Sequence, residues 1–223
     1  MTLLIDADDT LWENIVVFNA VNQAYLDWLL PGSTLAEMQS KLDAHQIEMI
    51  SIHGYGRETF EKSLLAGVER FGGRTPSTED VQRINELVAP LRWDTLDLLD
   101  DVPETLEQLA QRQQLLLVTK GDPVEQSLKV ERSGLARLFE AVEILPTKSP
   151  DEYATLIDDH SLDPTSTWMV GNSPRSDIAP ALEVGLNAVF IPHAQTWSHE
   201  HAEISAHPRL LQLALFRELL EHF

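Results

Sequence analysis

Short apolar runs alternate with amphipathic stretches over the second half of the chain. Residues 115–118, 142–145, 168–170 and 188–191 are apolar at nearly every position, as in strands buried on both faces of a parallel sheet. Helical spacing of apolar residues occupies most of the intervening sequence. This alternation predicts an α/β fold, with a doubly wound parallel sheet and right-handed crossovers. The apolar residues 3–5 predict one further strand.

A different pattern occupies residues 14 to about 90, where no segment has the character of a strand. Apolar positions at helical spacing predict four helices here, and Thr34-x-x-Glu37 has the form of a capping box at the start of the second. The sequence therefore predicts a small helical bundle inserted after the first strand. A closing helix is expected at residues 209–222, which are rich in leucine.

Three carboxylates follow the first predicted strand directly, in the string Asp6-Ala7-Asp8-Asp9-Thr10. The carboxyl end of such a strand lies where open α/β sheets bind their ligands. Neighbouring carboxylates repel each other unless a cation lies among them, so the string suggests a magnesium site and a carboxylate nucleophile. A solvated turn is the alternative interpretation, because Asp is common in turns.

Three later segments make the first interpretation more specific. They are Thr119-Lys120-Gly121-Asp122 after the second predicted strand, Lys148 just before a predicted helix start, and Gly171-Asn172-Ser173-Pro174-Arg175-Ser176-Asp177 after another strand. In this order, the four segments resemble the motifs of the haloacid dehalogenase superfamily of phosphatases and phosphotransferases. The resemblance implies a Rossmann-like catalytic core, residues 1–13 and 92–223, with an α-helical cap domain inserted at residues 14–91.

The resemblance also implies roles for the first two carboxylates. Asp6 would be the nucleophile that forms a phosphoaspartyl intermediate. Asp8 would be the general acid that protonates the leaving alcohol and then the base that activates water. The dehalogenase and phosphonatase branches of the superfamily lack an acid at the position of Asp8, so its presence points to phosphate ester chemistry.

By the same resemblance, Thr119 would bind a phosphate oxygen through its hydroxyl, helped by the backbone N–H groups of Lys120 and Gly121. Lys148 would balance the charge of Asp6 and of the transferred phosphoryl group. Since Lys-Ser-Pro stands where the superfamily often has Lys-Pro, Lys120 remains a competing cation.

The magnesium site implied by the resemblance would comprise Asp6, the main-chain carbonyl of Asp8, Asn172 and Asp177. Asn172 departs from the superfamily pattern, which has Asp at this position. An Asn carbonyl oxygen can ligate magnesium, but it carries no charge, and we expect weaker metal binding.

Two other groups of residues have open interpretations. The segment His53-Gly54-Tyr55-Gly56-Arg57 lies where caps of this superfamily often carry a specificity loop. Tyr55 and Arg57 are thus candidates for substrate contact, and an ordinary turn is an equally good interpretation. His193, His199, His201 and His207 lack a clean zinc-ligand spacing, and surface or packing roles are favoured.

Composition narrows the classes of partner. The chain has 36 acidic and 16 basic residues, for a formal net charge of −20, which disfavours nucleic acids and anionic membranes. It has no cysteine, a signal-peptide start is missing, and no apolar stretch approaches the length of a membrane span. We therefore expect a cytoplasmic enzyme acting on a small phosphorylated metabolite.

These inferences predict a magnesium-dependent phosphatase of small phosphomonoesters. A phosphomutase would use the same intermediate and pass the phosphoryl group to a second hydroxyl. A non-catalytic binding protein that kept the fold is a further alternative, motivated by Asn172.

Overall fold

The computed structural model describes residues 1–223 and divides them into two compact units. The first unit comprises Met1–Glu13 and Thr95–Phe223, and the second comprises Asn14–Asp94. The second unit ends at residue 94, and the insertion implied by the resemblance spans residues 14–91.

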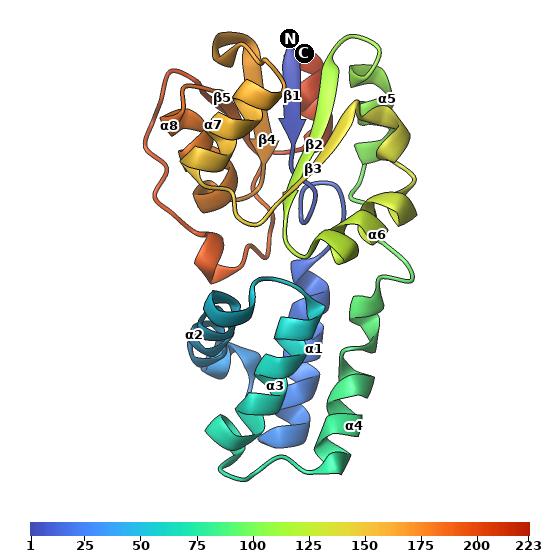
Figure 1. Cartoon of the computed structure of the whole chain (residues 1–223), viewed down its shortest axis with the longest axis vertical. Coiled ribbons are helices and arrows are strands. Elements are labelled where there is room, and N and C mark those ends of the chain that lie inside the picture. The colour runs from blue at the N-terminus through green and yellow to red at the C-terminus, as the bar shows by residue number, and fades with distance from the viewer. The chain divides into compact units, whose positions relative to one another are not determined.

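The first unit is built on one parallel sheet of six strands in the order β3-β2-β1-β4-β5-β6. Figure 1 labels β1 to β5. The strands are β1 (Thr2–Ile5), β2 (Gln114–Lys120), β3 (Ala141–Leu145), β4 (Thr167–Gly171), β5 (Asn187–Phe190) and β6 (Leu210–Gln212). This arrangement confirms the predicted α/β fold class. The first strand lies inside the sheet, paired with β2 on one side and β4 on the other.

Helices cover both faces of this sheet, as Figure 1 shows. They are α5 (Val102–Leu109), α6 (Pro123–Ser133), α7 (Pro150–Asp159) and α8 (Ala179–Glu183). Leu3 and Ile5 pack in one core cluster with residues of α5 and α6, whereas Leu4 packs with residues of α7 and α8. Successive side chains of a strand point to opposite faces. The apolar character of residues 3–5 therefore follows from burial on both sides.

The predicted closing helix at residues 209–222 is wrong. Residues Leu210–Gln212 form β6, which pairs in parallel with β5, and Phe216–Glu221 form a short 3₁₀ helix. The leucines of this segment fit either periodicity, and the edge of β5 supplies backbone partners that a helix would leave unpaired. Pairing within the sheet therefore outweighs local helical preference.

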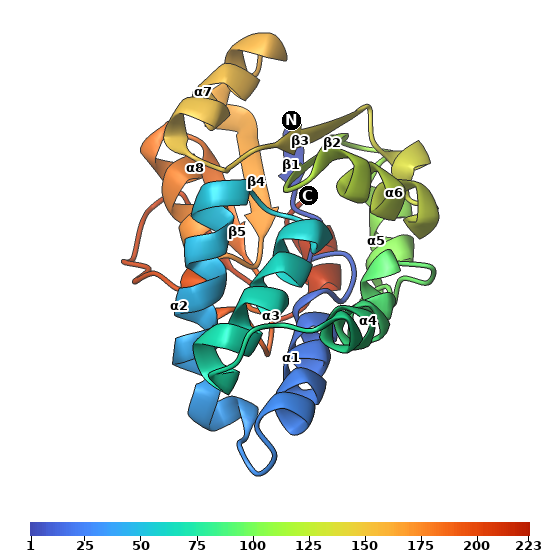
Figure 2. The same cartoon turned by 60° about the horizontal axis from the view of Figure 1, so that its bottom comes forward.

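The second unit contains four α-helices and no strand, which confirms the predicted helical character of this region. They are α1 (Ile15–Leu29), α2 (Leu35–His53), α3 (Arg57–Gly72) and α4 (Thr78–Leu87). Helix α1 contacts the other three, and Figure 2 shows them from a second direction. The predicted capping box of Thr34 and Glu37 starts α2, and Ser77 and Asp80 form another at the start of α4.

No helix in either unit combines the length and the apolar character that crossing a membrane requires.

Candidate active site

The candidate residues of the first unit come from neighbouring elements of its sheet. Asp6 follows β1, Thr119 lies near the end of β2, and Asn172 follows β4. Lys148 lies between β3 and α7. The carboxyl ends of parallel strands share one edge of a sheet, so this topology gathers residues that are far apart in the sequence.

A buried ion-pair cluster forms the centre of the site. The Lys148 ammonium donates to Asp6 Oδ1 at 2.5 Å and to Asp177 Oδ1 at 2.7 Å. All three side chains are almost completely buried. Lys148 therefore makes the contact with Asp6 that the resemblance implies.

This cluster holds more negative than positive charge. Burial, followed by the charge of Asp177, raises the pKa of Asp6 to about 7, although Lys148 and Thr10 oppose the increase. Burial disfavours the Lys148 ammonium, but the charges of Asp177 and Asp6 outweigh this effect and raise its pKa. The two carboxylates together exceed what one lysine can neutralise. Ionised Asp6 thus calls for a further cation.

Oxygen atoms suited to a hard cation lie beside Asp6. The Thr10 hydroxyl donates to Asp6 Oδ2 at 2.8 Å and lies 3.4 Å from Asn172 Oδ1, so these two oxygens converge on one point. Carboxylate, amide and main-chain carbonyl oxygens are the ligands that Mg²⁺ prefers in proteins. Asp6, Asn172 and the main-chain carbonyl of Asp8 therefore fit a magnesium ion by their chemistry.

Asp177 has less freedom to act as a direct ligand. Its Oδ1 accepts from Lys148, and its Oδ2 accepts the backbone N–H of Ser173 at 2.9 Å. A Cβ added at Gly171 would lie 2.2 Å from Asp177 Oδ2, so Asp177 is packed directly against the glycine. The predicted ligand role of Asp177 would require it to give up one of these contacts. Its observed role is to fix Lys148 and the loop after β4.

That loop contains a single π-helical turn over Pro174–Ile178. Ser173 precedes the turn, and its hydroxyl accepts the backbone N–H of Ser176 at 2.9 Å. Such turns are rare and often occur at functional sites. Here the turn brings Asp177 back towards Ser173.

Asp8 makes a separate set of contacts. Lys129 Nζ lies 3.0 Å from its Oδ1, Trp12 Nε1 donates to Oδ1 at 2.7 Å, and Gln126 Nε2 donates to Oδ2 at 2.9 Å. Burial raises the pKa of Asp8, but the Lys129 charge and these hydrogen bonds outweigh it and hold the pKa below its usual value. Asp8 is therefore ionised at neutral pH in this arrangement.

Sequence reasoning missed the three partners of Asp8. Gln126 and Lys129 are separated by three positions on α6, and such a pair shares one face of a helix. That spacing, directly after the second motif, was the available signal for these two residues. Lys129 is almost completely buried, which is uncommon for lysine and indicates a paired charge.

Thr119 is buried beside the same glutamine, and its hydroxyl donates to Gln126 Oε1 at 3.4 Å. The backbone N–H of Gly121 donates to the Leu145 carbonyl at 3.1 Å. The predicted phosphate contact from the Gly121 N–H would therefore require this sheet hydrogen bond to break. The Thr119 hydroxyl needs no such change.

Lys120, the competing cation, is directed elsewhere. Its ammonium donates to Ser176 Oγ at 2.7 Å and to Glu200 Oε1 at 2.6 Å. Glu200 belongs to the segment between β5 and β6, and the sequence analysis gave it no role. No residue pattern near Glu200 indicated that it would reach the motif loops.

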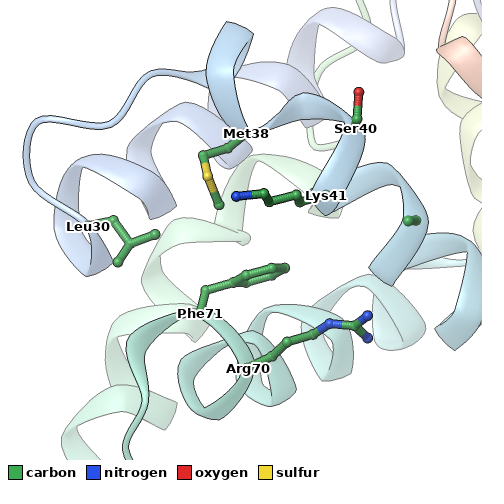
Figure 3. A pocket seen from close by; sticks show the side chains of 7 residues that line it. Leu30, Met38, Ser40, Lys41, Arg70 and Phe71 are labelled. Carbon is green, nitrogen blue, oxygen red and sulfur yellow. The ribbon is translucent and has the colours of Figure 1, made fainter.

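Tyr55 and Arg57 belong to the helical unit, where Arg57 begins α3 and lies 3.6 Å from Glu61. Neither lines the pocket shown in Figure 3, which lies in this unit and has a volume of about 650 Å³. Its lining residues are Leu30, Met38, Ser40, Lys41, Ala44, Arg70 and Phe71. The roles of Tyr55 and Arg57 in substrate contact stay predictions.

Among the C-terminal histidines, His193 lies 3.1 Å from Glu13 Oε2. Asp9, Glu13 and His193 place one ligand atom each within 4.8 Å of one another, and all three are partly exposed. His199, His201 and His207 do not belong to this group.

The parallel sheet and the contact of Lys148 with Asp6 agree with what the resemblance to the haloacid dehalogenase superfamily implies. The family model described as haloacid dehalogenase-like hydrolase matches residues 1–185, and the chain belongs to this family. Among curated proteins, none matches the chain significantly.

Solved structures share the fold over nearly the whole chain. A haloacid dehalogenase-like family hydrolase from Xanthomonas campestris is 28% identical, with a TM-score of 0.82, over 96% of this chain and 86% of its own. The putative HAD-hydrolase YfnB from Bacillus subtilis, bound to magnesium, is 17% identical, with a TM-score of 0.67. The match covers 99% of this chain and 97% of YfnB. A 2-haloacid dehalogenase from Pseudomonas syringae is 22% identical, with a TM-score of 0.62. The match covers 99% of this chain and 96% of the dehalogenase.

Proposed function

We propose that this hydrolase is a magnesium-dependent phosphatase of small phosphomonoesters. The observation that carries the proposal is the second carboxylate, Asp8, two residues after Asp6 and anchored by its own donors. Phosphoryl transfer from an ester needs both a nucleophile and a group that moves protons to the leaving alcohol and from water.

In the first step, an Asp6 carboxylate oxygen attacks phosphorus. The phosphorus–oxygen ester bond breaks, and the leaving oxygen takes a proton from Asp8. In the second step, Asp8 accepts a proton from water, and this water attacks phosphorus to release inorganic phosphate and restore Asp6. The contacts of Asp8 favour its ionised form, which is the form that accepts a proton from water in the second step. For the first step it must carry a proton, which its ion pair with Lys129 opposes.

The other residues of the site would bind the phosphoryl group and neutralise its charge. Lys148 contacts Asp6 and is placed to offset charge on the transferred phosphoryl group. The buried Thr119 hydroxyl is the candidate donor to a phosphate oxygen. When bound, Mg²⁺ would supply the positive charge that the cluster lacks, held by Asp6, Asn172 and the Asp8 carbonyl.

We assign the helical unit the role of a cap that admits substrate and then excludes water. Tyr55 and Arg57 are its candidate contacts with the substrate. A phosphomutase would share every residue named here and differ in the acceptor of the phosphoryl group.

The chief rival reaction is dehalogenation of a haloacid, with Asp6 displacing halide from carbon. The neutral Asn172 and the Lys148 bridge between two carboxylates favour it, because displacement at carbon needs no metal. Asp8 and its donors favour the phosphatase, because the carbon reaction has no leaving alcohol to protonate.

One experiment separates these reactions. Inorganic phosphate release from an aryl phosphate and chloride release from 2-chloropropionate are measured with magnesium and with EDTA, for the wild type and Asp6→Asn. Magnesium-dependent phosphate release that disappears in the variant supports the proposal. Chloride release that persists in EDTA would replace it with the rival, and equal activity in the variant would remove Asp6 as nucleophile. A mutase would instead convert a sugar monophosphate into its positional isomer when a sugar bisphosphate activator is added, because it passes the phosphoryl group to a second hydroxyl rather than to water.

A further inference from the structure

Glu200 is an acidic residue outside the proposed catalytic set whose carboxylate accepts hydrogen bonds from three different side chains. Its Oε2 accepts from Ser173 Oγ at 2.6 Å and from Ser176 Oγ at 2.5 Å, and its Oε1 accepts from Lys120 at 2.6 Å. Only 13% of its side-chain surface is exposed. The segment between β5 and β6 thus brings one carboxylate to the loop that carries Asn172 and Asp177.

Each partner of Glu200 adjoins a residue of the proposed site. Lys120 follows Thr119, Ser173 follows Asn172, and Ser176 precedes Asp177. Ser173 also donates its backbone N–H to Asp177. A change at Glu200 would therefore reach the cluster through Lys120 or through the two serines.

The charges favour the route through Lys120. The Asp6 and Asp177 carboxylates are shared by one lysine, and their surplus negative charge attracts any second cation nearby. Lys120 lies 2.7 Å from the hydroxyl of Ser176, next to Asp177 in the chain, and has a flexible stem. Without Glu200, the acidic residue that remains in this loop, residues 172–178, is Asp177.

We infer that Glu200 is a positioning residue: by pairing with Lys120 it keeps this ammonium away from the Asp6–Asp177 carboxylates and leaves them to Lys148. The same pairing keeps the oxygens beside Asn172 available to a metal ion rather than to a second ammonium. The second statement rests on the proposed function, whereas the first concerns the position of Lys120 alone.

The test compares Glu200→Ala, Lys120→Met and the double variant. Glu203→Ala is the matched control, because it removes the same charge from an exposed position of the same segment. Crystal structures in EDTA locate the Lys120 ammonium, and calorimetry measures magnesium affinity without turnover. We expect Lys120 to contact Asp6 or Asp177 in Glu200→Ala, with magnesium affinity reduced about tenfold.

The double variant identifies the route. Affinity should return close to the wild-type value when Lys120 is also replaced, since no ammonium is left to compete with the metal. Lys120 still on Ser176 in Glu200→Ala would overturn the inference. A double variant as weak as Glu200→Ala would also overturn it, because the effect would then pass through the serines.

A failure of the proposed function gives a different result. If the wild type binds no magnesium, the metal proposal falls, and the Lys120 position in the EDTA crystals alone decides the role of Glu200. If Glu200→Ala does not fold, Glu200→Gln keeps its size and its serine contacts, and the same outcomes apply.

Discussion

Each unit of the molecule contains a buried aspartate that pairs with a cation, but the two sites have opposite character. In the helical unit, Arg74 donates to both oxygens of Asp80, and the Ser77 N–H donates to one of them. These hydrogen bonds, that of Arg74 foremost, hold the pKa of Asp80 well below its usual value. In the sheet unit, burial and Asp177 raise the pKa of Asp6 despite Lys148.

The difference separates a structural carboxylate from one suited to chemistry. Asp80 has donors for its charge within its own capping box, so folding alone completes the site. Asp6 shares one lysine with a second carboxylate, so its site lacks positive charge until another group binds. A charge deficit at a buried carboxylate is therefore a better indicator of function here than burial itself.

Replacing the cation of each pair should give the largest contrast. Lys148→Met leaves two buried carboxylates without their shared cation, and we expect activity to fall about 10³-fold or more, together with a loss of stability. Arg74→Met should lower the thermal midpoint while activity per folded molecule stays near the wild-type value. Phosphate release and thermal unfolding measure both effects. An active Lys148→Met variant would end the distinction between the two sites.

A methyl group at Gly171 tests whether the Asp6 cluster depends on the exact position of Asp177. The added Cβ would overlap the Asp177 carboxylate, so this side chain must move and pull on Lys148. We expect activity to fall about 10²-fold, a loss typical of small displacements in active sites. Gly72→Ala, whose Cβ meets only a flexible leucine in the helical unit, is the control. Full activity of Gly171→Ala would show that Asp177 tolerates displacement.

The two aspartates should make opposite contributions to the pH dependence of stability. Asp80 binds its proton more weakly when folded, so its contribution is present above the unfolded pKa of about 3.8 and is lost as pH falls. Asp6 binds its proton more tightly in the folded protein. Its contribution to stability is therefore fully present below the unfolded pKa of 3.8 and is lost as the pH rises from there to about 7.

Urea unfolding in EDTA at several pH values measures how the free energy of unfolding depends on pH, and thus both contributions. Asp80→Asn should lose stability relative to the wild type above about pH 4, whereas Asp6→Asn should gain relative stability as pH rises towards 7. Added magnesium should remove the relative gain of Asp6→Asn. Parallel pH curves for Asp6→Asn and the wild type would contradict the charge deficit.

The smallest effects are expected at Tyr55, in the loop before α3, and at Arg57, the first residue of α3. Tyr55→Phe and Arg57→Gln should raise KM for a phosphate ester a few-fold and change kcat less than twofold, as expected for contacts that bind substrate uniformly. Lys62→Gln, an exposed residue of α3 paired with Glu58, is the control. Unchanged KM in both loop variants would favour the ordinary-turn interpretation of this segment.

The features that the sequence predicted well are those with strong local causes. Apolar runs indicated five of the strands; β1, β2, β4 and β5 are largely buried, which favours apolar residues, whereas β3 is partly exposed and contains Glu143. The capping box at Thr34 predicted one helix start correctly, because its side-chain oxygen meets a requirement of helix termini. Motif order placed Asp6 and Lys148 together, and they are in contact.

The features that it missed depend on partners distant in sequence. The strand β6 forms because β5 offers an edge, which no local pattern of leucines reveals. Lys129 and Glu200 lie in segments whose composition is typical of solvent-exposed sequence, and only folding brings them to Asp8 and Lys120. The side-chain direction of Lys120, in particular, is decided by a residue 80 positions later.

The central place of β1 has a consequence for how the chain acquires its activity during synthesis. The strand that leads to Asp6 is synthesised before both of its neighbours, because Thr2 pairs with Gln114 on one side and with Thr167 on the other. The entire helical unit must leave the ribosome before either neighbour exists. Until then, the three consecutive apolar residues of β1 have no sheet partners, and neither do the acidic residues that follow them. Contacts this distant in sequence form slowly, so β1 is the segment that a chaperone would most need to shield.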